Sequence, residues 1–275
     1  MHWEELTGDQ FSDAVVAAQG VCLVPLSCLE RHAHHLPLGT DLLIAHEVCR
    51  RAAVLEPVIV FPDIIFTQIL EARHYPGAVG LEAELVLGLL DSVCREIARN
   101  GLTKIVLVSS HGGNEHLMPF LAQAQLAQRR DYLLYVVAPH LLSEDEAAIS
   151  AQWETTVDGH AGEQETSMML AIRPELVHLS QAGDDSEGLP LRRLDALRKA
   201  GVYTGIWWYA DHPTHYCGVA RPATADKGER FLAAQSRALA AAIRAIKDDA
   251  EARRLQDEFF NAVDRLGVPG GTQGT

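Results

Sequence analysis

Two apolar segments of this chain run directly into clusters of histidine and acidic side chains. Residues 21–26 and 104–110 are short and mainly apolar, which is typical of buried strands. The first leads to residues 30–41, which hold three histidines and two carboxylates, and the second leads to His-Gly-Gly-Asn-Glu-His at 111–116. Such side chains at strand ends lie where α/β proteins build their sites, so the pattern predicts a polar site at one edge of a sheet.

Strands and helices alternate along the rest of the chain. We expect further strands at 57–62 and 132–138, loops at 184–188 and 210–222, and helices at 3–19, 41–53, 82–99, 117–128 and 227–260. Crossovers of this kind give a largely parallel sheet with helices on both faces. We therefore predict an α/β fold, a single-domain three-layer sandwich over residues 1–266, with residues 267–275 as a disordered tail.

A third polar segment, residues 158–170, combines glycines with histidine and glutamate at the expected start of a helix. His160 lies between Gly159 and Ala161, where a histidine has little reason to be there for packing. Glu163 and Glu165 both fall in the first turn of that helix, where the helix dipole favours negative charge. The residues alone leave open which of the two glutamates has a functional role.

Imidazoles and carboxylates are the ligands of zinc and manganese, and three such segments suit a centre of two metals. Two divalent ions at roughly 3.5 Å need a bridging carboxylate and several further ligands, and they activate a shared water and polarise a carbonyl group. A histidine outside the ligand set can then move a proton to the leaving nitrogen. This chemistry predicts a metal-dependent hydrolase.

These residues resemble the motifs of the creatininase (creatinine amidohydrolase) family over residues 20–230. The motifs, in chain order, are Glu-x-His-x-His-His at 30–35, Thr-Asp at 40–41, His-Tyr-Pro-Gly at 74–77, His-Gly-Gly-Asn at 111–114, His-Ala-Gly-Glu-x-Glu-Thr-Ser at 160–167 and Ala-Thr-Ala-Asp-Lys-Gly-Glu at 223–229. The resemblance implies a compact α/β fold, a homo-oligomer with a hexamer favoured, and two divalent ions per chain, zinc or manganese, with iron also compatible.

The resemblance also implies roles for particular residues. Glu30 and His32 would bind different ions, Asp41 would bridge them, and His111 would bind one. His160 matches the family's proton-shuttling histidine. The remaining assignments are Glu165 as a metal ligand and His74, Gly112, Gly113 and Asn114 as substrate-binding residues.

Two departures from the creatininase pattern bear on the substrate. Gly113 stands where creatininase has a ligand glutamate, which makes Glu165 the replacement candidate, and Thr156 stands where it has a tryptophan. Both departures argue against creatinine. We expect hydrolysis of a C–N bond in a small amide, cyclic amide or formamide. A peptidase-like member that trims a small peptide precursor and a non-catalytic metal-binding homologue remain as alternatives, whereas an arginase-like ureohydrolase uses other spacings.

Two features near these motifs have more than one interpretation. Trp207 and Trp208 could form an aromatic wall beside the substrate or pack in a core or subunit interface. Cys28 could be a ligand or could pack beneath the metal-binding loop. The five cysteines, at 22, 28, 49, 94 and 217, form no Cys-x-x-Cys pair, which argues against zinc-ribbon and thioredoxin folds.

Composition restricts the partners. The formal net charge of −14 and the pI near 5.3 disfavour nucleic acid and anionic membranes. Neither a signal peptide nor an apolar stretch approaching 20 residues is visible, so we expect a soluble cytoplasmic enzyme with a small-molecule substrate. Apolar and aromatic residues at 205–209, in a segment that looks like a loop, favour burial of that patch in an oligomer.

Overall fold

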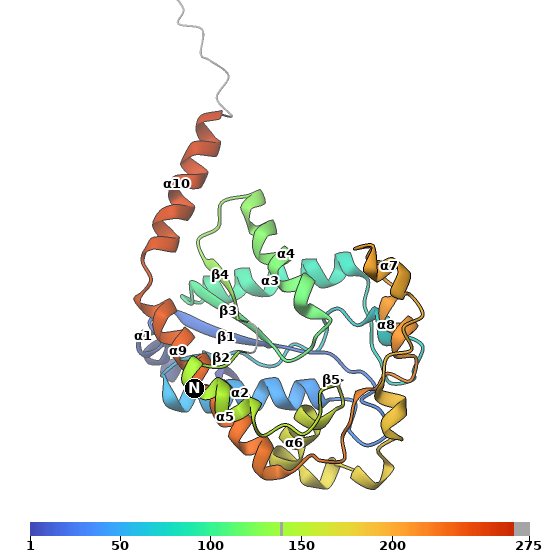
Figure 1. Ribbon diagram of the computed structural model, residues 1–275. Coiled ribbons are helices and arrows are strands. Elements are labelled where there is room, and N and C mark those ends of the chain that lie inside the picture. The colour runs from blue at the N-terminus through green and yellow to red at the C-terminus, as the bar shows by residue number, and fades with distance from the viewer. Residues whose placement is uncertain (138–139, 267–275) are drawn as a thin grey trace, which may run out of the picture.

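A four-stranded parallel sheet forms the centre of the protein, in a computed structural model that describes residues 1–137 and 140–266 (Figure 1). The strand order is β2-β1-β3-β4, and every neighbouring pair is parallel. The strands are β1 (Val21–Leu26), β2 (Ile59–Val60), β3 (Lys104–Ser109) and β4 (Leu133–Val137). A separate antiparallel pair consists of β5 (Asp158–His160) and β6 (Cys217–Gly218).

Helices cover both faces of the main sheet. The α-helices are α1 (Gly8–Ala17), α2 (Thr40–Leu55), α3 (Ala83–Arg99), α4 (Asn114–Ala124), α5 (Ser143–Ser150), α6 (Glu163–Ile172), α7 (Asp195–Lys199), α8 (Trp207–Asp211), α9 (Ala225–Asp248) and α10 (Glu251–Leu266). The short 3-10 helices are η1 (Trp3–Glu5), η2 (Leu70–Ala72), η3 (Gln125–Ala127), η4 (Pro174–Leu176), η5 (Leu179–Gln181) and η6 (Asp185–Gly188). Among the described residues, no helix is both long and apolar enough to cross a lipid bilayer.

Alternate residues of each strand face opposite helical layers. In β1, Val21 and Leu23 pack with α2, α6 and α9, whereas Cys22 and Val24 pack with α1, α3 and α4. Because side chains alternate along a strand, one sheet supplies two hydrophobic cores. The predicted α/β class with helices on both faces of a parallel sheet is confirmed. The expected tail at 267–275 lies outside the described residues.

Several expected elements have different boundaries. β2 is only two residues long at the sheet edge, because Pro57 and Pro62 on either side have no N–H to donate. The helix expected at 3–19 is interrupted where Thr7 caps α1 in a reciprocal capping box with Gln10. The loop expected at 184–188 contains η6, and the loop expected at 210–222 contains the end of α8 and β6.

The long helix expected at 227–260 is in fact two helices. Asp249 is extended, and its Oδ1 accepts hydrogen bonds from the backbone of Glu251 and Ala252, as an N-cap does. Lys104 Nζ donates to three backbone carbonyls at the end of α9 and so terminates that helix. These contacts come from β3 and from the turn itself, so helical periodicity could not reveal them.

Candidate active site

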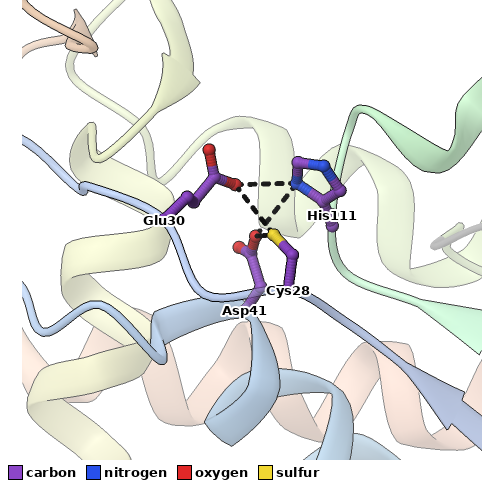
Figure 2. A group of neighbouring side chains, drawn as sticks. All are labelled: Cys28, Glu30, Asp41 and His111. Atoms are coloured by element: carbon purple, nitrogen blue, oxygen red, sulfur yellow. Dashed lines mark hydrogen bonds and ion pairs between the residues drawn. The ribbon is translucent and has the colours of Figure 1, made fainter. Parts of the chain in front are cut away.

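The side chains of Cys28, Glu30, Asp41 and His111 converge beyond the carboxyl ends of β1 and β3 (Figure 2). His111 Nδ1 lies 2.7 Å from Glu30 Oε1 and 3.1 Å from Asp41 Oδ2. The sulfur of Cys28 lies 3.5 Å from Glu30 Oε1 and 3.7 Å from Asp41 Oδ2. All four residues are buried, so the first two polar segments do meet as their strand-end positions predict.

The third segment completes the cluster. His32 Nε2 lies 3.1 Å from Asp41 Oδ1 and 3.8 Å from Glu165 Oε2. Asp41 therefore directs one carboxylate oxygen towards His111 and the other towards His32. A carboxylate placed between two imidazoles in this way has the position of a bridging ligand.

The helix starts help to explain why carboxylates are tolerated here. Asp41 lies in the first turn of α2 and Glu165 in the first turn of α6, while His111 lies two residues before Gly113, the N-cap of α4. A helix N-terminus carries partial positive charge and so stabilises a nearby carboxylate. The cluster thus occupies a point where three helices begin.

The charged side chains of the cluster shift one another's pKa values. Burial would lower the pKa of His32, but Asp41 and Glu165 outweigh burial and raise that pKa to about 10. Burial raises the pKa of Glu165 to about 8, so this carboxyl holds a proton near neutral pH. Burial also raises the pKa of the Cys28 thiol.

Of the two glutamates that the sequence left open, only Glu165 joins the cluster. Glu163 is fully buried, but its Oε1 accepts from Lys227 Nζ at 2.5 Å and its Oε2 accepts from both the backbone and the hydroxyl of Thr155. Glu165 instead accepts from the backbone N–H of Ala161 at 2.6 Å and faces His32. Glu163 therefore has a structural role, because its ion pair with Lys227 joins α6 to α9.

His160 lies over the cluster, on β5 and not on a free loop. Its ring centroid is 4.2 Å from that of His32, and its Nε2 lies 2.8 Å from the carbonyl oxygen of Arg31. Since a carbonyl only accepts, Nε2 carries the hydrogen and Nδ1 keeps the lone pair. Burial, with His32 next, lowers the pKa of His160 to about 3, so the ring is neutral.

Both histidines that face Asp41 have their second nitrogen fixed by a backbone carbonyl. His32 Nδ1 lies 3.2 Å from the Glu30 carbonyl oxygen, and His111 Nε2 lies 2.8 Å from that of Gln68. Metal-binding histidines are usually oriented by such a contact, which fixes the tautomer. The contact leaves His32 Nε2 and His111 Nδ1 facing the carboxylates.

Sequence reasoning missed His215, which lies in a segment expected to be a loop. His215 Nε2 lies 2.6 Å from Glu30 Oε2, and the indole N–H of Trp208 donates to His215 Nδ1 at 3.0 Å. Trp208, whose role was open, therefore touches the site through His215 and also contacts the ring of His160. The only sequence signal was the pair of histidines at 212 and 215.

The four expected substrate-binding residues occupy different environments. His74 lies near the rim, where its Nε2 is 3.0 Å from the Pro213 carbonyl oxygen. Gly112 is exposed. Asn114 is fully buried, and its side-chain amide donates to Ser109 Oγ, so Asn114 stabilises the turn between β3 and α4. A Cβ on Gly113 would lie 2.3 Å from His111 Nε2 and 2.6 Å from Glu71 Oε1, so a side chain there has no room.

A cavity of about 400 Å³ adjoins the α6 side of the cluster. Its lining includes the polar residues Asp158, Gln164 and Glu165 and the apolar residues Trp153, Met168 and Phe231. Trp153 and Phe231 meet edge to face with ring centroids 5.3 Å apart. Cavities of roughly 300–1,000 Å³ with apolar walls and a few polar groups are typical of small-molecule sites.

Buried carboxylates and imidazoles at the strand ends of an α/β sheet are the side chains of a candidate enzyme site, and comparison identifies the family. The sequence model of the creatininase family, described as creatinine amidohydrolase, matches residues 4–243. The chain belongs to this family of hydrolases, which confirms the resemblance of its motifs.

Named relatives differ in what they act on. Creatinine amidohydrolase of Pseudomonas putida is 29% identical over 66% of this chain and 75% of its own. The mycofactocin precursor peptide peptidase of Mycobacterium ulcerans (strain Agy99) is 30% identical over 77% of this chain and 79% of its own. The 3-dehydro-scyllo-inosose hydrolase of Thermotoga maritima is 26% identical over 77% and 73%, respectively.

Solved structures share the fold. A putative creatinine amidohydrolase from Bacteroides fragilis superposes with a TM-score of 0.73 at 25% identity, covering 84% of this chain and 90% of that one. A manganese form of creatininase gives a TM-score of 0.71 at 25% identity, with coverage of 90% and 99%. A mutant creatininase of the zinc–zinc type has the same fold.

We expect Gly113→Ala to weaken zinc binding by roughly 10- to 100-fold, the usual effect of disturbing the support of a ligand. The added methyl group would displace either the His111 ring or the Glu71 carboxylate. Affinity is measured by competition with a chromophoric chelator. Gly112→Ala is the matched control, because nothing lies within 4 Å of its Cβ. Equal affinities of the two variants would contradict this account of Gly113.

Proposed function

We propose that this protein is a dinuclear metal-dependent amidohydrolase that cleaves a C–N bond of a small molecule other than creatinine. The observation that carries the proposal is the placement of Asp41 between His32 and His111, at 3.1 Å from each. Glu165 stands next to His32 and Glu30 next to His111, so each imidazole has a carboxylate besides Asp41.

The donor set fits two divalent ions. Glu30, Asp41 and His111 would hold one, and His32, Asp41 and Glu165 would hold the other. Three carboxylates and two imidazoles suit zinc or manganese. When bound, such a pair polarises a carbonyl group and makes water nucleophilic near neutral pH. The chain itself orients both imidazoles through backbone carbonyls and keeps the carboxylates of Glu30 and Asp41 out of bulk water.

Elemental analysis of the purified protein should find two divalent ions per chain. Asp41→Ala should remove both, since it deletes the carboxylate between the two imidazoles. Asp63→Ala is the control, because Asp63 pairs with His46 outside the cluster and should leave the metal content unchanged. At most one ion in a protein with all five proposed ligands intact would refute a dinuclear centre.

His160 is placed to move protons. Its Nδ1 carries the lone pair, and its Nε2–H is held by the Arg31 carbonyl, so the ring can accept a proton without changing orientation. Burial lowers the pKa of His160, so the ring is neutral and its lone pair is available. The proposed ligand set is complete without His160, although its nitrogens lie close enough to Glu165 and His32 to make a ligand role testable.

His160→Ala should lower kcat by roughly 10²- to 10⁴-fold while both metals stay bound, the range usual for general acid–base catalysis. Steady-state kinetics combined with metal analysis of the same sample tests this. The exposed His116 supplies the control variant His116→Ala, which should keep kcat. A near-normal kcat for His160→Ala would leave that histidine a purely structural role, and loss of a metal would make it a ligand.

The cavity beside Glu165 supports a substrate larger and less polar than creatinine. Burial raises the pKa of Asp158 to about 7, so near neutral pH this carboxyl can donate or accept a hydrogen bond. Trp153 and Phe231 add apolar surface to the lining of the same cavity. These features suit an amide that carries an apolar substituent. They also favour the second candidate, a peptidase, which the similarity to mycofactocin precursor peptide peptidases supports as well.

Turnover by the metal-loaded protein should separate these substrate classes. We expect hydrolysis of cyclic amides, formamides or short peptides, and poor turnover of creatinine because Gly113 and Thr156 replace residues of the creatininase pattern. Released amine is measured with and without chelator. Efficient turnover of creatinine would overturn the substrate proposal, and no turnover of any amide by protein carrying two ions would favour a non-catalytic homologue.

We also propose that the protein forms a homo-oligomer, with a hexamer favoured by the family resemblance. The segment expected to supply an apolar patch forms α8, in which Trp208 faces the site. Ile206 is 58% exposed just before this helix, and Tyr209 is 39% exposed within it. These side chains support burial of that surface between subunits.

A further inference from the structure

One side of α10 is fixed to the body of the protein. Phe260 is buried under the guanidinium of Arg129, which also pairs with Asp257 and Asp264 of α10. Arg253 donates to backbone carbonyls of the loop between α4 and β4. Figure 1 shows α10 leaving the body after α9 and running beyond it. The helix is therefore held in one orientation by a single face.

The opposite face of α10 is apolar and exposed. Leu255, Phe259 and Leu266 are 47%, 41% and 88% exposed. Together with Ala252 and Ala262 they recur at alternating spacings of three and four residues, the a and d positions of a heptad repeat. Val263, also exposed, widens the stripe. A helix with a wide apolar stripe normally buries it against another element.

We propose that α10 pairs antiparallel with α10 of a second copy of this chain. In an antiparallel pair, a positions of one helix lie opposite d positions of the other. Leu255 then meets Leu266 of the partner subunit, and Phe259 meets Ala262 of the partner subunit. Placing the large Phe259 opposite the small Ala262 gives layers of similar volume, and the two-fold symmetry repeats every layer.

Charge complementarity indicates that a second copy of this chain binds to the exposed face of α10. With Ala252, Phe259 and Leu266 at a positions, Glu258 and Arg265 occupy g positions, where charges flank the apolar seam. An antiparallel pair brings g positions together, so Glu258 faces Arg265 of the partner subunit and Arg265 faces Glu258 of the partner subunit. A parallel pair would place Glu258 opposite Val263 of the partner subunit and would leave both charges unmatched.

The local charge also removes an obstacle to self-association. The whole chain carries a formal charge of −14, which opposes contact between two copies. The α10 helix has four acidic and three basic residues and therefore a formal net charge of −1, so this helix is nearly neutral. The family match ends at residue 243, before α10 begins, so the pairing is separate from the proposed catalytic function.

The first test measures the mass of the full-length protein by sedimentation velocity at micromolar concentration. Phe259→Glu should halve the mass of the largest species, because it places a charge at the centre of the seam. Leu85→Glu is the control, since Leu85 is 57% exposed on α3, outside the seam, and should leave the mass unchanged. Circular dichroism and enzymatic activity of both variants should stay normal. An unchanged mass for Phe259→Glu overturns the proposal.

A charge exchange tests the antiparallel direction. Glu258→Arg and Arg265→Glu should each raise the dissociation constant roughly tenfold, because each makes two pairs of like charges. The double variant should return to the wild-type value. Glu258 also pairs with Arg254 at 2.7 Å within the helix, but the double variant still lacks that pair, so rescue cannot come from it. Two results would overturn the antiparallel arrangement. One is an unchanged dissociation constant in both single variants, and the other is a double variant that associates more weakly than either single variant.

Discussion

The gathering of three carboxylates at one point, Glu30 and Asp41 buried and Glu165 half-buried, is the constraint on which the rest of the site depends. Removing a carboxylate from water costs several kcal/mol unless opposite charge and hydrogen bonds compensate for it. Here the N-termini of α2 and α6 and the imidazoles of His32 and His111 supply that compensation. Glu165 remains the least compensated, because burial raises its pKa to about 8. The proposed pair of divalent ions would add positive charge beside this carboxyl.

The support for this cluster comes from segments far apart in the chain. Trp208 orients His215, which in turn holds Glu30, while the Gln68 carbonyl orients His111. The Arg31 carbonyl does the same for His160. Each contact determines which imidazole nitrogen carries the hydrogen. Gln68 and Trp208 lie outside the family motifs, so segments beyond the motifs help to set the protonation pattern of the site.

The fold and the first ligands could be predicted because their signals are local. Apolar runs identify β1 and β3, and the position of His111 at a strand end is enough to predict that it lies near Glu30. His215 could not be found in this way, because its role depends on a contact across 185 residues of chain with Glu30. The same holds for the break between α9 and α10, which depends on Lys104 and Asp249. Periodicity reports burial along one segment and is silent about such distant partners.

Glu71 explains why the chain can depart from the creatininase pattern at Gly113. Its carboxylate, which accepts a hydrogen bond from Gln68 Nε2, lies where a side chain on Gly113 would begin. In this chain the carboxylate near His111 comes from η2 and lies 3.8 Å from Nε2, the nitrogen that faces away from Asp41. The Glu71 carboxylate thus lies on the far side of His111 from Asp41, whereas Glu165 lies between His32 and the cavity. In this chain η2 therefore supplies the carboxylate beside His111 that position 113 cannot supply.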